Sequence, residues 1–114
     1  MTEHELLKHL LENPDALVFA DVLAVIDSHY QFVPTGFRNG DTRNEPGQNN
    51  GSCKVFAFAL RHHLDAGATL ALFAEHYRSV LATPEGGDHA NIRNFQRTGW
   101  DGIAFDGEAL LARD

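Results

Sequence analysis

The sequence predicts a mainly α-helical protein: a single compact helical domain of about five helices, with a long central loop and one short strand pair. Three observations support this fold class. The chain has 114 residues, a length that suits a single domain with one core. Hydrophobic residues make up 43% of it, enough to fill such a core. Apolar residues recur at helical spacing in segments that are separated by proline or glycine.

Two amphipathic helices are predicted at the start of the chain. Thr2 and Glu5 have the spacing of a capping box, so the first helix should begin directly after Thr2. Pro14 should end it, because proline cannot continue a helix. The second helix is predicted from apolar residues at i, i+3, i+4, i+7 and i+11, which are Phe19, Val22, Leu23, Ile26 and Tyr30.

Residues 31–52 have a different composition and predict a long loop. This segment contains two prolines, four of the ten glycines and the turn signal Asn39-Gly40. A connection of this length in a small domain is uncommon and is often functional. The embedded Phe32 and Phe37 favour a loop that is anchored to the core, or that forms a short strand, over a mobile surface loop.

Two further helices are predicted after this loop. Ser52 is a suitable N-cap for a helix from Cys53 to about Leu64, and apolar residues surround that helix, so it should be the central one. Thr69 is then expected to cap a helix that continues to Leu81 and ends before Pro84.

The last helix is predicted from Asp88, as N-cap, to Gly99, as the residue that ends it. In that frame Trp100 should pack on Phe95, the hydrophobic contact that accompanies a glycine ending. Ile103 and Phe105 alternate with small residues and predict a short strand beside the Phe32–Phe37 region.

Composition excludes several classes of protein. The formal net charge of -7 argues against nucleic-acid binding and against docking on an anionic membrane. A single cysteine cannot form an internal disulfide. The acidic N-terminus has no signal-peptide character, and no apolar segment is long enough to span a membrane. These features predict a cytoplasmic protein.

Several motifs together resemble the HopJ type III effector family across nearly the whole chain, 1–114. The resemblance is carried by residues 30–40, 50–59, 76–78, 88–95 and 99–100. Ala74 stands where the family pattern favours glycine, and Glu45-Pro46 and Gln96 are further departures. The resemblance implies an effector translocated into a host cell by a type III secretion system, and it implies no biochemical activity. The helix expected almost at Met1 leaves no room for a polar secretion signal, which favours a resident cytoplasmic role.

Cys53 is a candidate catalytic nucleophile. A thiol at a helix start, beside Lys54, has a lowered pKa. A cysteine-dependent enzyme would also need a base, for which His89 is the candidate. The apolar residues that follow Cys53 favour the alternative that the thiol is part of the core. The sequence therefore leans against an enzyme.

Polar residues of the loop and of the last helix predict a binding site instead. His89, Arg93 and Arg97 lie at i, i+4 and i+8 and make one basic stripe in an acidic protein. Gly86 and Gly87 precede that helix, whose backbone N–H groups could meet an anion. We predict a small binding or interaction module whose partner is a protein or a small anionic ligand. The predicted ligand-binding residues are Asn39, Asn50, Lys54, Arg78, His89, Asn91, Arg93 and Asn94.

A structural role is the alternative for about half of these polar residues. Arginine and asparagine can satisfy many loop carbonyl and N–H groups at once. On this interpretation they hydrogen-bond the long loop onto the helices. The residues concerned are Asn39, Asn49, Asn50, Arg78, Arg93 and Asn94.

No metal site and no cofactor are expected from the spacing, and a metal site assembled from distant segments stays open as the alternative. Neither a His-x-x-x-His pair nor a cysteine pair is present. His62 and His63 are adjacent, and on a helix their side chains point about 100° apart.

Overall fold

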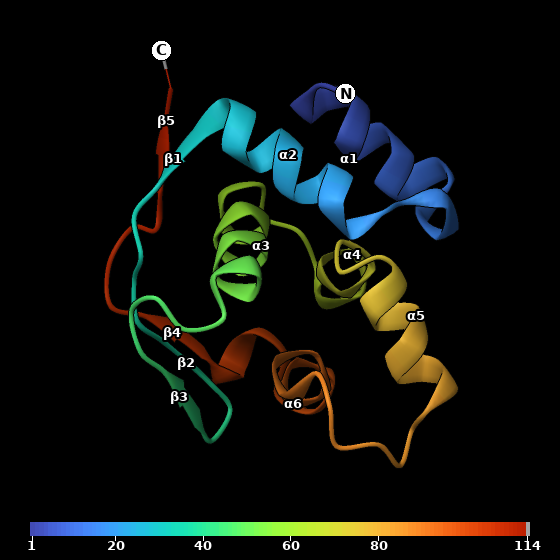
Figure 1. Cartoon of the computed structure of the whole chain (residues 1–114), viewed down its shortest axis with the longest axis vertical. Coiled ribbons are helices and arrows are strands. Elements are labelled where there is room, and N and C mark those ends of the chain that lie inside the picture. The colour runs from blue at the N-terminus through green and yellow to red at the C-terminus, as the bar shows by residue number, and fades with distance from the viewer. Residues whose placement is uncertain (114) are drawn as a thin grey trace.

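Helix α3 (Asn50–Arg61) lies at the centre of the molecule, and the other helices and two small sheets surround it (Figure 1). The computed structural model describes residues 1–113. Within them the other α-helices are α1 (Glu3–Glu12), α2 (Phe19–His29), α4 (Ala66–Ala71), α5 (Glu75–Ala82) and α6 (Ala90–Thr98). The strands are β1 (Tyr30–Phe32), β2 (Phe37–Asn39), β3 (Thr42–Asn44), β4 (Ile103–Phe105) and β5 (Leu110–Ala112). Two short 3-10 helices, η1 (Pro14–Ala16) and η2 (Gly99–Gly102), complete the fold.

The core is built around Phe56 of α3. Its ring centroid lies 5.4 Å from that of Phe73, 5.0 Å from that of Phe95 and 5.8 Å from that of Phe37. These partners come from the turn after α4, from α6 and from β2, so one side chain connects three parts of the fold. Aromatic pairs at such distances add about 0.5–1.5 kcal/mol each beyond their burial. The prediction that α3 is the central helix is therefore confirmed.

The first two helices form as predicted. Glu5 N donates to Thr2 Oγ1 over 3.1 Å, and Thr2 N donates to Glu5 Oε1 over 3.0 Å, which completes the capping box. Helix α1 ends at Glu12, before Pro14, and α2 begins at Phe19.

The start of α3 differs from the prediction. The helix begins at Asn50, three residues earlier than expected, and Asn49 rather than Ser52 holds the N-cap position. Asn49 has a φ of 51°, in the left-handed region that asparagine tolerates better than most residues. The N-cap prediction was wrong because it assumed a residue whose side chain caps the helix. The observed N-cap residue is left-handed and makes no such hydrogen bond, so the sequence carries no capping signal for it. The helix also ends at Arg61, earlier than Leu64.

The predicted helix from Thr69 to Leu81 is in fact two helices, α4 and α5. Asp65 caps α4 through a 2.8 Å bond from Ala68 N, and Thr69 lies buried inside that helix. Between the helices the backbone turns at Ala74, whose φ is 54°. This positive φ agrees with the glycine that the family pattern favours there. Periodicity did not reveal the break because buried apolar residues continue through the turn.

Helix α6 begins one residue later than predicted, with His89 at the N-cap in place of Asp88. Like Asn49, His89 is left-handed, with a φ of 52°. The predicted ending is confirmed: Gly99 follows the helix with a positive φ, and the ring centroids of Phe95 and Trp100 lie 5.1 Å apart.

The predicted long loop contains short strands. A turn at Gly40, whose φ is 64°, joins β2 to β3 as an antiparallel hairpin. Strand β4 pairs with the other edge of β2, with Phe37 opposite Phe105, so the expected strand pair is confirmed. A second pair, β1 with β5, was not predicted, because strands of three residues carry almost no periodic signal.

Within residues 1–113 no helix is both long and apolar enough to cross a membrane.

Asparagine side chains join the β2–β3 hairpin to the starts of α3 and α6. Asn91 Oδ1 accepts from Asn39 Nδ2 at 2.9 Å and from Asn44 Nδ2 at 3.2 Å. Asn44 Oδ1 accepts from Asn91 Nδ2 at 3.0 Å and from Asn49 Nδ2 at 2.8 Å. We call these four residues the asparagine network. It fixes the starts of α3 and α6 relative to each other.

Removing the centre of the asparagine network should destabilise the fold. Asn91→Ala leaves the buried Asn44 Nδ2 group without its acceptor, and an unsatisfied buried polar group costs about 1–3 kcal/mol. We expect a loss of that size in the free energy of unfolding, measured by urea denaturation. Asn50→Ala is the matched control, because Asn50 is exposed and should change stability by less than about 0.5 kcal/mol. Equal effects of the two substitutions would contradict the role given to the network.

Glu3, Tyr30 and His62 connect α1, β1 and the end of α3. The Tyr30 hydroxyl donates to Glu3 Oε1, and His62 Nε2 lies 2.6 Å from the same oxygen. Partial burial acts to raise the pKa of Glu3, but the hydrogen bonds from Tyr30 and His62 outweigh it and lower that pKa. The unfolded chain therefore binds this proton at a higher pH than the folded protein does. Glu3 contributes stability above its ordinary pKa and loses it as pH falls through the lowered folded value.

Glu3→Gln should remove this pH-dependent stability. We expect the variant to be less stable than the parent at pH 6, and the difference to shrink as the pH is lowered toward 3. Urea denaturation at several pH values measures it. Glu12→Gln, which changes an exposed carboxylate at the other end of the same helix, is the control. A difference that is independent of pH would contradict the assignment.

Candidate functional site

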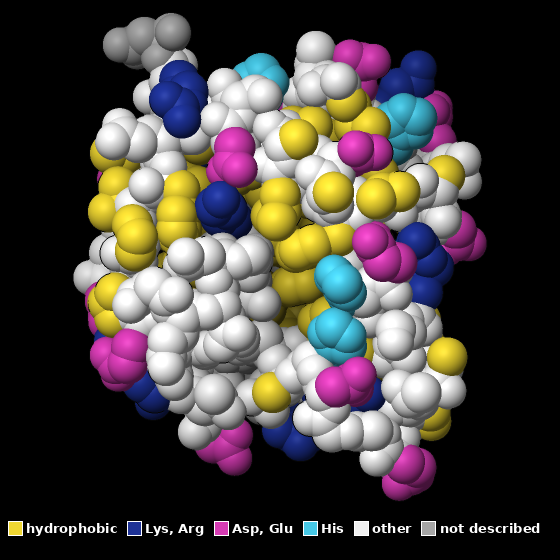
Figure 2. Space-filling model, in the orientation of Figure 1, with side chains coloured by type: hydrophobic (Ala, Val, Ile, Leu, Met, Phe, Trp, Pro, Cys, Tyr) yellow, Lys and Arg dark blue, Asp and Glu magenta, His cyan; other side chains and the backbone are white. Residues whose placement is uncertain are grey.

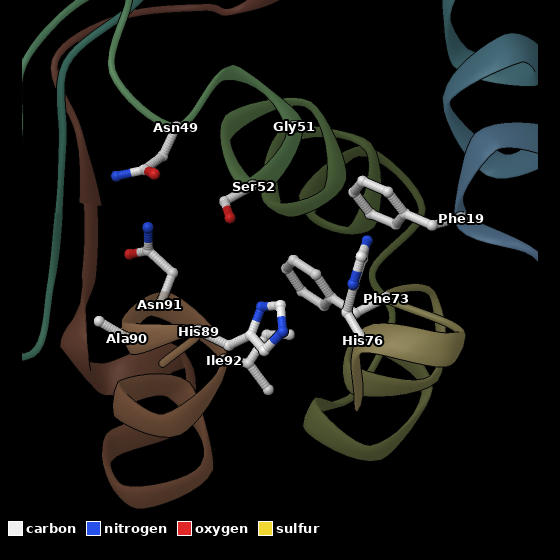
Figure 3. Close-up of a pocket in the computed structure, with 10 residues that line it drawn as sticks. All are labelled: Phe19, Asn49, Gly51, Ser52, Phe73, His76, His89, Ala90, Asn91 and Ile92. Atoms are coloured by element: carbon white, nitrogen blue, oxygen red, sulfur yellow. The ribbon is translucent and has the colours of Figure 1, made fainter. Parts of the chain in front are cut away.

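A pocket of about 380 Å³ opens where the starts of α3 and α6 meet α2 and the α4–α5 turn. Figure 2 shows a hollow with a hydrophobic floor on this face of the molecule, with two histidine side chains at its edge. Figure 3 shows the lining side chains. They are Phe19, Asn49, Gly51, Ser52, Phe73, His76, His89, Ala90, Asn91 and Ile92.

Both helices that begin at the pocket do so without a capping side chain. Asn49 and His89 are the N-cap residues of α3 and α6, and within residues 1–113 neither start has a side-chain cap. The first N–H groups of a helix have no partner inside it, and the helix dipole places about half a positive charge there. Two such starts converge on one pocket.

Ser52 points from the first turn of α3 into the pocket, and the imidazoles of His76 and His89 lie on the opposite side (Figure 3). The two ring centroids are 5.0 Å apart and the rings are tilted by 41°. His76 comes from α5 and His89 from the start of α6. The polar part of the pocket therefore contains a hydroxyl and two imidazoles from three elements.

The floor of the pocket is apolar and rigid. Phe19 and Phe73 stack with their centroids 6.0 Å apart, and His76 packs edge-on to Phe19 at 4.8 Å. Gly51 allows this close packing, because a Cβ at that position would lie 3.2 Å from the Phe19 ring. Ile92 is buried beside them.

Two of the predicted ligand-binding residues, His89 and Asn91, line the pocket. Asn91 also belongs to the asparagine network, so its amide is already hydrogen-bonded. Asn50 is exposed at the start of α3 and does not line the pocket.

The predicted basic residues lie outside the pocket and have intramolecular partners. Lys54 Nζ is 2.9 Å from Asp27 Oδ1, and Arg78 donates to the carbonyl of Leu17 over 3.0 Å. Arg93 donates to the carbonyl of Thr83 over 2.8 Å. It also donates to Asp88 Oδ1 over 2.7 Å. Of the expected basic stripe, Arg93 therefore holds the α5–α6 connection, Arg97 donates to Asn94 Oδ1, and His89 lines the pocket.

The amides of the hairpin and α6 also serve the fold. Asn39 is fully buried and donates to the carbonyl and the side chain of Asn91. Asn94 Nδ2 donates to Thr42 Oγ1 over 2.8 Å. The structural alternative, in which these residues hydrogen-bond the long loop onto the helices, is confirmed for Asn39, Asn49 and Asn94. Arg78 and Arg93 also serve the fold, but they bond other connections, at Leu17 and Thr83.

Sequence reasoning missed Ser52, His76 and Asn49 as pocket residues. Ser52 was assigned to capping and Asn49 to loop structure, and His76 was not among the predicted site residues. One signal was present: Ser52 and His76 both lie within the motifs that carry the family resemblance. No sequence pattern indicated the apolar floor of the pocket, because Phe19 and Phe73 have the spacing of ordinary core residues on a helix.

Cys53 is part of the core, as its apolar neighbours indicated. It is 1% exposed, and its Sγ donates to the carbonyl of Thr35 over 3.5 Å. Burial raises the pKa of the thiol, and the contact with Thr35 only partly offsets this. The expected lowering of the pKa by the helix start and Lys54 does not prevail, because Lys54 is paired with Asp27 and the thiol is desolvated.

The fold and pocket define a small helical protein with a polar pocket between helix starts. A model of the HopJ type III effector protein family matches residues 3–110, and the chain belongs to that family. The crystal structure of the unknown function protein VPA0580 is similar over 99% of this chain and 95% of its own, with 48% identity and a TM-score of 0.96. No curated protein matches the sequence.

Cys53 should be unreactive in the native protein. Because the thiol is buried and its pKa is raised, we expect iodoacetamide at pH 7.5 to modify it only after denaturant is added. Mass spectrometry of the intact chain over time measures this. Rapid modification of the folded protein would contradict the assignment of Cys53 to the core and would support a nucleophilic role for its thiol.

Proposed function

We propose that this HopJ family protein is a binding module that holds a small anionic ligand in the pocket between α3 and α6. One observation carries the proposal: two uncapped helix starts and two histidines converge on a single concave site. Backbone N–H groups at a helix start point toward a ligand, and the dipole favours negative charge there.

The charge of the whole protein does not oppose such a ligand strongly. The formal net charge is -7, but exposed charges more than about 8 Å away are largely screened at physiological salt. Contacts inside the pocket therefore dominate. Ser52 adds a hydroxyl donor, and each imidazole can donate from a ring N–H group.

The pocket limits the size and kind of ligand. A volume of about 380 Å³ lies at the small end of the range for small-molecule sites, roughly 300–1,000 Å³. Polar groups surround an apolar floor of Phe19, Phe73 and Ile92. These features suit a compact metabolite with one acidic group, such as a carboxylate or a phosphate, and do not suit a polymer.

Thermal denaturation with inorganic phosphate and with benzoate, each in EDTA, tests the proposal. A ligand at ten times its Kd stabilises the folded state by about 1.4 kcal/mol, which raises Tm by roughly 4–8 °C in a domain near this size. We expect at least one of these anions to raise Tm. If neither phosphate nor benzoate changes Tm, the anion-binding proposal is overturned.

Ser52→Asp should abolish the anion-dependent rise in Tm. The new carboxylate would occupy the start of α3 and repel a bound anion. Ser79→Asp is the matched control, because it adds the same charge at an exposed position of α5 outside the pocket. An equal loss in both variants would show a net-charge effect and not a site.

A cysteine-dependent enzyme is the alternative that we do not favour. Cys53 is buried, its pKa is raised, and its thiol contacts a backbone carbonyl in place of a base. His89 lines the pocket, whereas Cys53 is not among the pocket residues.

Because the chain belongs to a family of type III effector proteins, we also propose that it is delivered into a host cell. A translocation reporter fused to the C-terminus, compared in strains with and without a working type III apparatus, tests that delivery separately from ligand binding.

A further inference from the structure

We propose that His76 and His89 together bind a divalent transition-metal ion of the zinc type. The inference goes beyond anion binding and does not depend on it. It rests on the placement of two imidazoles from separate elements, α5 and the start of α6, side by side in one pocket. Their separation of 13 positions along the chain gave no metal-site spacing in the sequence.

The geometry of the pair fits a shared ion. With Zn–N bonds of about 2.0–2.1 Å in tetrahedral geometry, two imidazole ring centroids lie roughly 5 Å apart. The His76 and His89 centroids are 5.0 Å apart, and the rings are tilted by 41° and not stacked face to face.

Charged groups near the pair bear on which metals fit. Asp88 Oδ2 lies 3.8 Å from His89 Nε2. Glu75 is the neighbour of His76 on α5, and its Oε1 accepts from Phe19 N over 2.7 Å. Asp88 also pairs with Arg93, so its charge is partly balanced. The positive helix starts oppose a cation. Binding must therefore come from nitrogen coordination, which favours zinc, nickel or copper over magnesium and calcium.

The ion would have open coordination positions. Among residues 1–113 no group of three His, Cys, Asp or Glu side chains is placed to hold a metal. The two imidazoles would thus be the only His, Cys, Asp or Glu ligands of the ion among the described residues. Water, the Ser52 hydroxyl or a bound anion would fill its remaining coordination positions. Zinc sites with an open position usually have three protein ligands and bind water or substrate at the fourth position. The His76–His89 pair supplies one ligand fewer, so more than one position would be open to water or an anion.

Isothermal titration of tag-free, EDTA-stripped protein with zinc, nickel and magnesium chlorides, without phosphate, tests the proposal. We expect saturable binding of one zinc or nickel ion per chain and no binding of magnesium. His76→Gln and His89→Asn should each weaken zinc binding at least tenfold. Asparagine is chosen at position 89 because it tolerates the left-handed backbone. His9→Gln, at an exposed position on α1, is the matched control and should leave the affinity unchanged.

Electron paramagnetic resonance of the copper-loaded parent protein gives a second measurement that needs no variant. Nitrogen hyperfine structure from two imidazoles is expected. The proposal is overturned if zinc does not bind saturably, if both histidine variants retain the parent affinity, or if copper shows no nitrogen coordination. If a variant fails to fold, as judged by circular dichroism, the copper spectrum decides. A phosphate-induced rise in Tm in EDTA would survive failure of the metal site, so the two proposals are tested separately.

Discussion

The asparagine network is the interaction on which the candidate site depends. Asn44 and Asn91 bond each other, and Asn49 joins them from the start of α3. Through these bonds a short β-hairpin fixes two helix starts at one position. Amide side chains suit this role, because each provides both donors and an acceptor in a buried environment where unsatisfied groups are costly.

Backbone conformation explains why the pocket is polar. Asn49 and His89 adopt left-handed conformations at the two N-caps, so their side chains do not cap their own helices. The Asn49 side chain bonds the network, and His89 contributes to the pocket. Positive φ costs a non-glycine residue stability. Strain of this kind is often found at functional sites, and here both strained residues line the same pocket. The fold thus places two helix starts without side-chain caps beside one pocket.

Much of the fold could be predicted from local sequence signals. The capping box of Thr2 and Glu5, the apolar stripe of α2 and the Gly99 ending of α6 each depend on residues within one or two turns, and each is confirmed. The errors share a cause as well. The break at Ala74 and the caps at Asn49 and His89 are left-handed positions occupied by residues other than glycine, so composition gives no warning of them. The basic stripe was a misleading signal, because Arg93 is used to hold the α5–α6 connection.

The sequence by itself determined the helical class, the central place of α3, the burial of Cys53 and the HopJ resemblance, because periodicity, composition and motif order are local properties. Only the tertiary structure decided where the pocket lies. Ser52, His76 and His89 lie on three elements far apart in the chain. They meet because Phe56 packs α3 against the α4–α5 turn and α6, while the asparagine network fixes the starts of α3 and α6. Contacts between distant residues are set by packing, which no local pattern records.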